Sequence, residues 1–146
     1  MTQEQKDLLL KDLCARLPYG VKGRVSKRDC NNRKCEFVAT IDGKLYDKFA
    51  VAQELWYDNV TIKPYLFPLS SMTEEQKKEF LSVAGYEMRE EDCGRHTETY
   101  YYDMVGHERN FYPNSEAIDW LNENKFDYRG LIPMDLAIDA TNKNIY

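Results

Sequence analysis

Three cysteines and one histidine are the residues of this sequence whose types and spacing best suit chemistry. Four residues separate Cys30 from Cys35, and two separate Cys93 from His96. Both spacings suit metal-binding turns, and three thiolate sulfurs with one imidazole nitrogen would complete a tetrahedral zinc site. A structural zinc ion is therefore one hypothesis for these residues, provided that the fold brings the two turns together. The favoured interpretation is that these side chains are unligated loop residues, and no cofactor is expected.

A basic run between residues 22 and 34 is the second candidate site. The run contains six cationic side chains and a single carboxylate, Asp29, so it is positively charged although the whole chain has a formal net charge of -5. Lys22 and Arg24 have the same parity, so on an extended strand they would share one face and contact phosphates or an acidic protein. The alternative interpretation is a solvated hairpin. The run consists of Lys22, Arg24, Lys27, Arg28, Arg33 and Lys34.

His96, Asp103 and His107 include the residue types that acid–base catalysis uses. The sequence does not fix their geometry, and on one strand His96 and Asp103 would point to opposite faces. The sequence also has no phosphate-binding glycine loop, dinucleotide fingerprint, nucleophile elbow or paired-histidine metalloprotease helix. We therefore assign no catalytic residue, and an unfamiliar small hydrolase or nuclease is the weakest functional hypothesis.

Three helices that would position these residues are predicted from caps and apolar spacing. The first covers residues 3–16 and the second residues 74–84, and a threonine with a glutamine three residues later gives each a capping box. The third follows the cap Asn114 and ends near Glu123. Trp120 lies on its apolar face, where burial contributes about 2 to 3 kcal/mol.

A β-meander is predicted in the first half of the chain, where short runs are rich in valine, isoleucine, threonine and aromatic residues. The best hairpin signal is Asp42-Gly43, which suits a two-residue turn between strands at 36–41 and 44–49. The segment 63–69 contains two prolines that cannot donate to a ladder. We therefore expect it to be an edge strand or an extended loop.

The second half of the chain shows alternation in two places. Residues 96–105 alternate well enough to predict a strand, and residues 134–139 favour another. The acidic segment 86–92 has no clear pattern, and we expect its carboxylates to lie in a solvated loop.

The length and composition indicate one domain with its own core. The chain has 146 residues, of which 42% are hydrophobic and 13% aromatic. We expect a single compact domain, residues 1–146, of the α+β class, with a mostly antiparallel sheet of about four to six strands and about three helices. The net negative charge argues against a whole surface that coats nucleic acid or anionic membrane.

The sequence predicts a cytoplasmic protein. Its first residues lack the apolar segment of a signal peptide, and no stretch has the length of a membrane span. In a reducing cytoplasm the four cysteines are expected to be thiols or metal ligands, because disulfides rarely persist there.

Two segments of the chain have sequences that resemble those of other proteins. One is residues 62–75, IKPYLFPLSSMTEE, and the other runs from residues 119–121 through residues 127–133, DYRGLIP, to residues 137–138. Together they cover about a quarter of the chain. They resemble short hypothetical proteins encoded in gut Bacteroides genomes and in their prophages or mobile elements. The resemblance implies a bacterial or phage-infected cytoplasm and an accessory role, and it carries no activity, cofactor or catalytic residue.

The leading functional hypothesis is a small non-catalytic binding protein that acts on an unidentified host or phage protein. It follows from a folded core and an uneven charge distribution in a sequence without a reaction motif. The second hypothesis is a zinc-stabilised, nucleic-acid-binding accessory module that uses the basic run. No membrane partner is expected.

Overall fold

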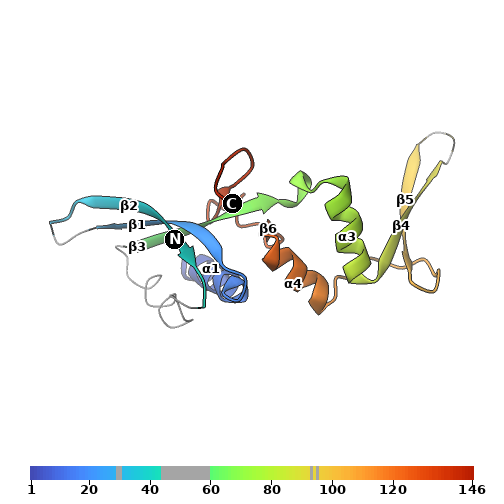
Figure 1. The fold of residues 1–146 in the computed structure, drawn as a ribbon, viewed down its shortest axis with the longest axis horizontal. Helices are drawn as coiled ribbons and strands as arrows, with labels where there is room; N and C mark the ends of the chain where they lie inside the picture. Colours follow the sequence, from blue (N-terminus) through green and yellow to red (C-terminus); the bar gives the residue numbers. More distant parts are fainter. Residues whose placement is uncertain (29–30, 44–59, 93, 95) are drawn as a thin grey trace. The chain divides into compact units, whose positions relative to one another are not determined.

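Figure 1 shows a computed structural model of the chain, which describes residues 1–28, 31–43, 60–92, 94 and 96–146. Contacts divide the chain into two compact units. Unit 1 combines Met1–Ser71 with Asn122–Tyr146, and unit 2 is Met72–Leu121.

A five-stranded sheet is the framework of unit 1. Its strands are β1 (Val21–Arg28), β2 (Lys34–Ile41), β3 (Val60–Pro68), β6 (Phe126–Asp127) and β7 (Ile138–Asp139). The strand order is β2-β1-β3-β6, and β7 also pairs with β3. β1 is antiparallel to both of its neighbours, whereas β6 and β7 run parallel to β3. A 3-10 turn, η1 (Leu69–Ser71), follows β3.

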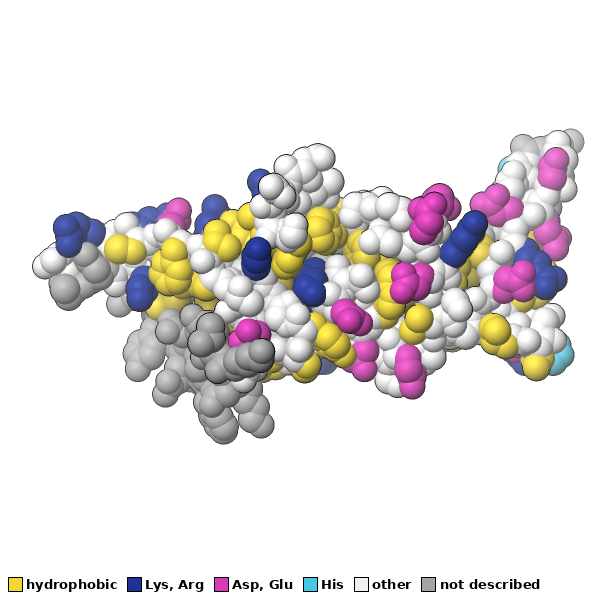
Figure 2. All heavy atoms as spheres, in the orientation of Figure 1, with side chains coloured by type: hydrophobic (Ala, Val, Ile, Leu, Met, Phe, Trp, Pro, Cys, Tyr) yellow, Lys and Arg dark blue, Asp and Glu magenta, His cyan; other side chains and the backbone are white. Residues whose placement is uncertain are grey.

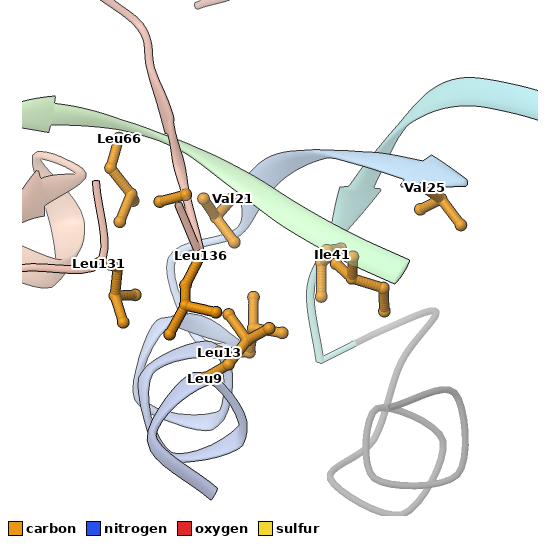
Figure 3. Close-up of a cluster of buried hydrophobic side chains, with 10 residues drawn as sticks. Leu9, Leu13, Val21, Val25, Ile41, Leu66, Leu131 and Leu136 are labelled. Atoms are coloured by element: carbon orange, nitrogen blue, oxygen red, sulfur yellow. The ribbon is translucent and has the colours of Figure 1, made fainter. Parts of the chain in front are cut away.

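Helix α1, Gln3–Arg16, packs on this sheet and supplies much of its core. The helix begins with a capping box, in which the Thr2 hydroxyl accepts from the Gln5 amide at 3.2 Å and the Gln5 side chain accepts from the Thr2 amide at 2.9 Å. Leu9 and Leu13 are fully buried, and Figure 3 shows them close to Leu136. The leucines at helical spacing therefore close one side of the sheet.

A buried ion pair lies on the same helix. Arg16 donates to the two carboxylate oxygens of Asp12 at 2.8 and 3.0 Å, and both side chains are 0% exposed. The same guanidinium donates to the Phe126 carbonyl at 2.9 Å. The pair therefore ties α1 to β6.

Unit 2 is built from two helices and a hairpin. Its elements are α3 (Glu74–Ala84), β4 (Tyr86–Asp92), β5 (Thr97–Asp103) and α4 (Ser115–Glu123), of which the part up to Leu121 belongs to this unit. β4 and β5 form a separate antiparallel two-stranded sheet. The Asn114 side chain caps α4 by accepting from the Ala117 amide at 2.8 Å.

Aromatic rings form the core of unit 2. Phe80 of α3 lies 5.6 Å from Trp120 and 5.7 Å from Phe111, measured between ring centroids. Tyr86 and Tyr101 of the hairpin also contact Phe111, at 5.1 and 5.5 Å. Trp120 is 7% exposed, so the predicted burial of this residue is confirmed.

The predicted α+β class is confirmed. Within the described ranges the chain has three α-helices and a mostly antiparallel arrangement of strands, and the helices have the predicted positions. The single domain expected from the length stays a prediction. In the part of the chain that the structure describes, no helix is both long and apolar enough to cross a membrane.

The strand predicted as one alternative for residues 63–69 forms as part of β3. Its partners change along its length, because β1 pairs with its first half as far as Pro64 and β7 pairs at Tyr65 and Leu66. The Lys63 carbonyl oxygen lies 3.5 Å from the point that a Cβ on Gly23 would occupy, so the backbone groups of Lys63 face β1. The backbone nitrogen and carbonyl of Pro64 then face the opposite edge of β3. Its missing N–H therefore costs no hydrogen bond to β1.

The strand predicted at residues 134–139 forms only at its end, where Ile138–Asp139 is β7. The residues before it are in turns. The Asp127 carboxylate accepts from the amides of Leu131 and Ile132, both at 2.8 Å. These two hydrogen bonds, to amides four and five residues after Asp127, hold the turn at Leu131 and Ile132, and the apolar alternation of the sequence does not indicate them.

The acidic segment 86–92 is a strand rather than a loop. It forms β4 and pairs along its whole length with β5, which confirms the strand predicted near residues 96–105. The strand expected at residues 44–49 lies outside the described residues, so the hairpin at Asp42-Gly43 stays a prediction.

Candidate binding surface

The two faces of the β1–β2–β3 sheet differ sharply in character. On one face Val21, Val25 and Ile62 are buried beneath α1. Side chains on a strand alternate between faces, and residues paired across an antiparallel ladder share a face. The pairs Arg24 with Lys63 and Arg28 with Lys34 therefore lie on the opposite face.

We call this opposite surface the basic face. It carries five cations, which are Lys22, Arg24, Arg28, Lys34 and Lys63. Ser26, Thr40 and Thr61 lie between them, together with Val38, which is 50% exposed. Figure 2 shows Lys and Arg side chains along the β1–β2 hairpin, with hydrophobic side chains among them.

Four of the six predicted patch residues lie on the basic face, and two do not. Lys27 has the opposite parity, and its ammonium lies 5.6 Å from the ring centroid of Phe37. Arg33 lies in the turn before β2. The prediction of one shared charged face therefore holds for Lys22, Arg24, Arg28 and Lys34.

Two carboxylates lie among these cations. Lys34 binds Glu36 at 2.7 Å, and the hydrogen bond from Lys34, followed by that from Ser26, lowers the pKa of Glu36. Lys63 binds Asp135 at 2.6 Å, and that hydrogen bond lowers the pKa of Asp135. The Arg24 charge contributes a smaller lowering to the pKa of both carboxyls. The face is therefore positive overall but not uniformly so.

The segment that contains Tyr146 covers one end of the basic face. The Lys22 ammonium donates to the Ile145 carbonyl and lies 5.9 Å from the ring centroid of Tyr146. The Lys22 amide donates to the Tyr146 hydroxyl at 3.0 Å. Lys22 is consequently engaged inside the protein, whereas Arg24, Arg28 and Lys34 are exposed.

The predicted zinc ligands are described only in part. Cys30 and Cys93 lie outside the described residues, so the zinc site stays a prediction. Cys35 is exposed in β2, and its thiol lies 3.9 Å from the Arg33 carbonyl oxygen. His96 binds Glu98 with 2.6 Å between the ring nitrogen and the carboxylate. In the ranges that the structure covers, no three His, Cys, Asp or Glu side chains are grouped to hold a metal ion.

The acid–base set does not form one site. His107 Nδ1 lies 3.6 Å from an oxygen of Asp103, whereas His96 precedes β5 and Asp103 ends it. Seven residues of extended strand separate the two by roughly 23 Å. Asp103 instead organises its own turn, accepting from the amides of His107 and Val105 at 2.9 and 3.1 Å. These bonds, that of His107 first, lower the pKa of Asp103.

Sequence reasoning missed two members of the surface, Lys63 and Asp135. Lys63 lies in a segment whose prolines led us to predict an edge strand or an extended loop, and Asp135 lies in a segment that we predicted to be a strand. A strand prediction for residues 60–63 would have given Lys63 and Thr61 the same face. No local pattern indicates the contact between Lys63 and Asp135, which are far apart in the chain.

Comparisons with models of protein families, with curated proteins and with solved structures find no match to this chain.

Proposed function

We propose that this chain is a non-catalytic binding protein that engages an acidic protein partner through the basic face. The observation that carries the proposal is the strand register, which gathers four cations of one sequence run and Lys63 on one face of the sheet. Such a surface attracts an oppositely charged partner and speeds its association, and it needs no reacting group.

The composition of the basic face favours a protein over a nucleic acid. Glu36 and Asp135 interrupt the cations and would repel a phosphate backbone, which binds best along an uninterrupted positive stripe. Val38 adds an exposed apolar contact, as protein interfaces commonly contain. The acidic remainder of the chain, seen in unit 2 as Asp and Glu side chains over α3 and the hairpin in Figure 2, also disfavours the dense phosphate charge of a nucleic acid.

The resemblance to short proteins of Bacteroides and their prophages supports a setting for this activity. We propose that the chain acts in the cytoplasm of a bacterium or of a phage-infected bacterium, on a host or phage protein. A surface of charges and hydroxyls that is not paired with a reaction motif suits an accessory protein of this kind.

Charge reversal on the basic face tests the proposal. The double variant Arg24→Glu with Arg28→Glu should lose most of its binding to fluorescent polyglutamate, about tenfold or more, since each exposed ion pair contributes about 0.2 to 1 kcal/mol. The matched control is Lys11→Glu with Lys78→Glu, which makes the same change in net charge at exposed positions away from this face.

Salt and a second ligand sharpen the test. Binding of wild-type protein to polyglutamate should weaken as salt is raised, because exposed charges are screened. A short DNA duplex is measured in parallel. Equal loss of polyglutamate binding in both double variants, or tighter binding of the duplex than of polyglutamate, would contradict the proposal.

A further inference from the structure

The two edges of β3 are used differently along its length. Leu66 accepts through its carbonyl from the Ala140 amide, next to β7, at 2.8 Å. Phe67 donates from its amide to the Lys125 carbonyl, next to β6, at 2.9 Å. Consecutive residues of a strand point their backbone groups to opposite edges. β7 and β6 therefore pair with opposite edges of β3.

The same alternation assigns the earlier residues of β3. The Lys63 carbonyl points toward β1, as its position beside Gly23 shows. The N–H and C=O of Ile62 consequently point to the other edge, the one that β7 uses farther along. In the described ranges, β1 is the only strand that pairs with residues 60–64. This part of the β7-side edge thus presents a donor and an acceptor of Ile62.

A pocket of about 300 Å³ lies along this edge. Leu9, Ile62 and Leu136 give it an apolar lining, and Thr61, Lys63 and Asp135 give it a polar one. Its volume is at the lower end of the range of ligand pockets, about 300 to 1,000 Å³. It therefore suits a short segment of chain rather than a large cofactor.

The pocket exists because the segment before β7 turns away from β3 and does not pair with it. The Leu136 amide donates to the Leu131 carbonyl at 2.9 Å, and Asp135 has a left-handed backbone with φ 57°. A turn thus replaces the continuation of β7 toward Ile62. Among the residues that the structure describes, none pairs with β3 at Ile62 on the line that β7 occupies.

We propose that this edge of β3 binds an extended peptide segment of the acidic partner, with an aliphatic residue between two acidic ones. A strand added here would alternate its side chains between the two faces of the sheet. On the core side it would meet Leu9 and Leu136, and on the other side Lys63 of the basic face. The aliphatic residue lies opposite Ile62 and exchanges both backbone hydrogen bonds with it.

Asp135 occupies the place of one acidic residue of that peptide. Its carboxylate binds Lys63 at 2.6 Å although its own side chain is 90% exposed. A peptide carboxylate must displace it to reach the ammonium. The proposal therefore makes Asp135 an internal competitor, and removing its charge should strengthen binding. This inference rests on the proposed binding of an acidic partner.

The probe is the capped peptide acetyl-Thr-Glu-Leu-Glu-Thr-amide, with versions that carry isoleucine, valine or methionine in place of leucine. We expect NMR shift changes at Thr61, Ile62 and Lys63, slower hydrogen exchange of the Ile62 amide, and a Kd no weaker than about 1 mM. The N-methyl-leucine version lacks the central donor and should bind at least about fivefold more weakly, because one hydrogen bond is lost.

Two protein variants with controls locate the site. Asp135→Asn keeps a residue that tolerates a left-handed backbone and should tighten peptide binding by about two- to fivefold. Met134→Trp fills the pocket at a 38% exposed position and should weaken binding by about tenfold. Glu36→Gln removes the other carboxylate of the basic face, and Met104→Trp adds the same bulk in unit 2. Neither Glu36 nor Met104 lines the pocket, so both controls should change the affinity by less than about twofold.

The outcomes separate this inference from the proposed function. If no version of the peptide binds at about 1 mM while polyglutamate binding still depends on Arg24 and Arg28, the edge site is wrong and the acidic partner stands. Shift changes confined to β2, or no gain in Asp135→Asn, overturn the edge site as well. If charge reversal at Arg24 and Arg28 leaves polyglutamate binding intact, the proposed function itself is overturned.

Discussion

The Tyr146 hydroxyl donates to the Tyr65 carbonyl at 2.8 Å, joining two residues that lie 81 positions apart in the chain. The same hydroxyl accepts from the Lys22 amide at 3.0 Å. Lys22 is the second residue of β1, and Tyr65 follows the last residue of β3 that pairs with β1. The phenol therefore joins β1 to β3 at the point where their ladder ends, and its ring packs on Phe67 with 5.8 Å between centroids.

Removing this hydroxyl should loosen the end of the sheet. Tyr146→Phe keeps the ring but leaves the Lys22 amide and the Tyr65 carbonyl without the bridge. We expect the free energy of unfolding to fall by about 1 to 2 kcal/mol in urea titration, the usual cost of two lost hydrogen bonds at a partly buried site. Tyr112→Phe, at a 72% exposed position, is the matched control and should change it by less than about 0.5 kcal/mol. Equal stability of both variants would contradict the bridge.

Burial raises the pKa of Tyr146 from its ordinary value of 10.0 to about 12, against the lowering effects of the Lys22 amide and the Arg16 charge. The unfolded chain therefore loses this proton at a lower pH than the folded chain does. The stability from neutral Tyr146 is complete below about pH 10 and is lost as the pH rises toward 12. Wild-type protein should lose about 1 kcal/mol more than Tyr146→Phe over this window, since the ring is partly exposed. Parallel pH dependence of the two would argue against a raised pKa.

The Asp12–Arg16 pair gives a prediction about the core. Asp12→Ala leaves the Arg16 guanidinium buried without its carboxylate, and it should lower the free energy of unfolding by about 3 to 5 kcal/mol. Asp7→Ala, at an exposed position of the same helix, should cost less than about 1 kcal/mol. The double variant Asp12→Leu with Arg16→Met should recover part of the loss, because it removes both charges of this pair while Arg129 still loses its 3.3 Å contact with Asp12. A double variant as unstable as Asp12→Ala would contradict this account.

Local signals in the sequence were sufficient for the helices. Thr2 and Thr73 each sit three residues before a glutamine, and both capping boxes form as the sequence predicts. Asn114 likewise caps α4. Each of these interactions joins residues only three positions apart, so the pattern along the chain contains all the information that the helix start needs.

The sheet depended on contacts that no local pattern records. Pro64 favoured an edge strand or an extended loop, and it is tolerated in β3 because its nitrogen points away from β1. Asp127 holds the turn at Leu131 and Ile132 that precedes the strand expected at residues 134–139. In the first place the outcome depends on which edge of the strand Pro64 faces, and in the second on which amides a nearby carboxylate binds, and hydrophobic alternation indicates neither.

Only part of the basic face could be predicted from the sequence, because the rest depends on how the strands pair. The parity of Lys22 and Arg24 indicated a shared face, and the register with β2 adds Lys34 to it. Lys63 joins through β3, and it brings the carboxylate of Asp135 with it. The charge of the run was therefore predictable, whereas the groups that modulate it required the tertiary structure.

Trp120 provides a test of the core of unit 2. Its ring packs against Phe80, which also contacts Phe111, and truncation would leave a cavity among these rings. We expect Trp120→Ala to lower the free energy of unfolding by about 3 to 5 kcal/mol. Amides of α3 and α4 should then exchange hydrogen faster, which hydrogen-exchange mass spectrometry measures. Tyr112→Ala removes an aromatic ring that is 72% exposed and should leave that exchange nearly unchanged. If Trp120→Ala is as stable as Tyr112→Ala, the aromatic cluster does not hold unit 2 together, because a buried ring of this size cannot be removed from a packed core without a large loss of contacts.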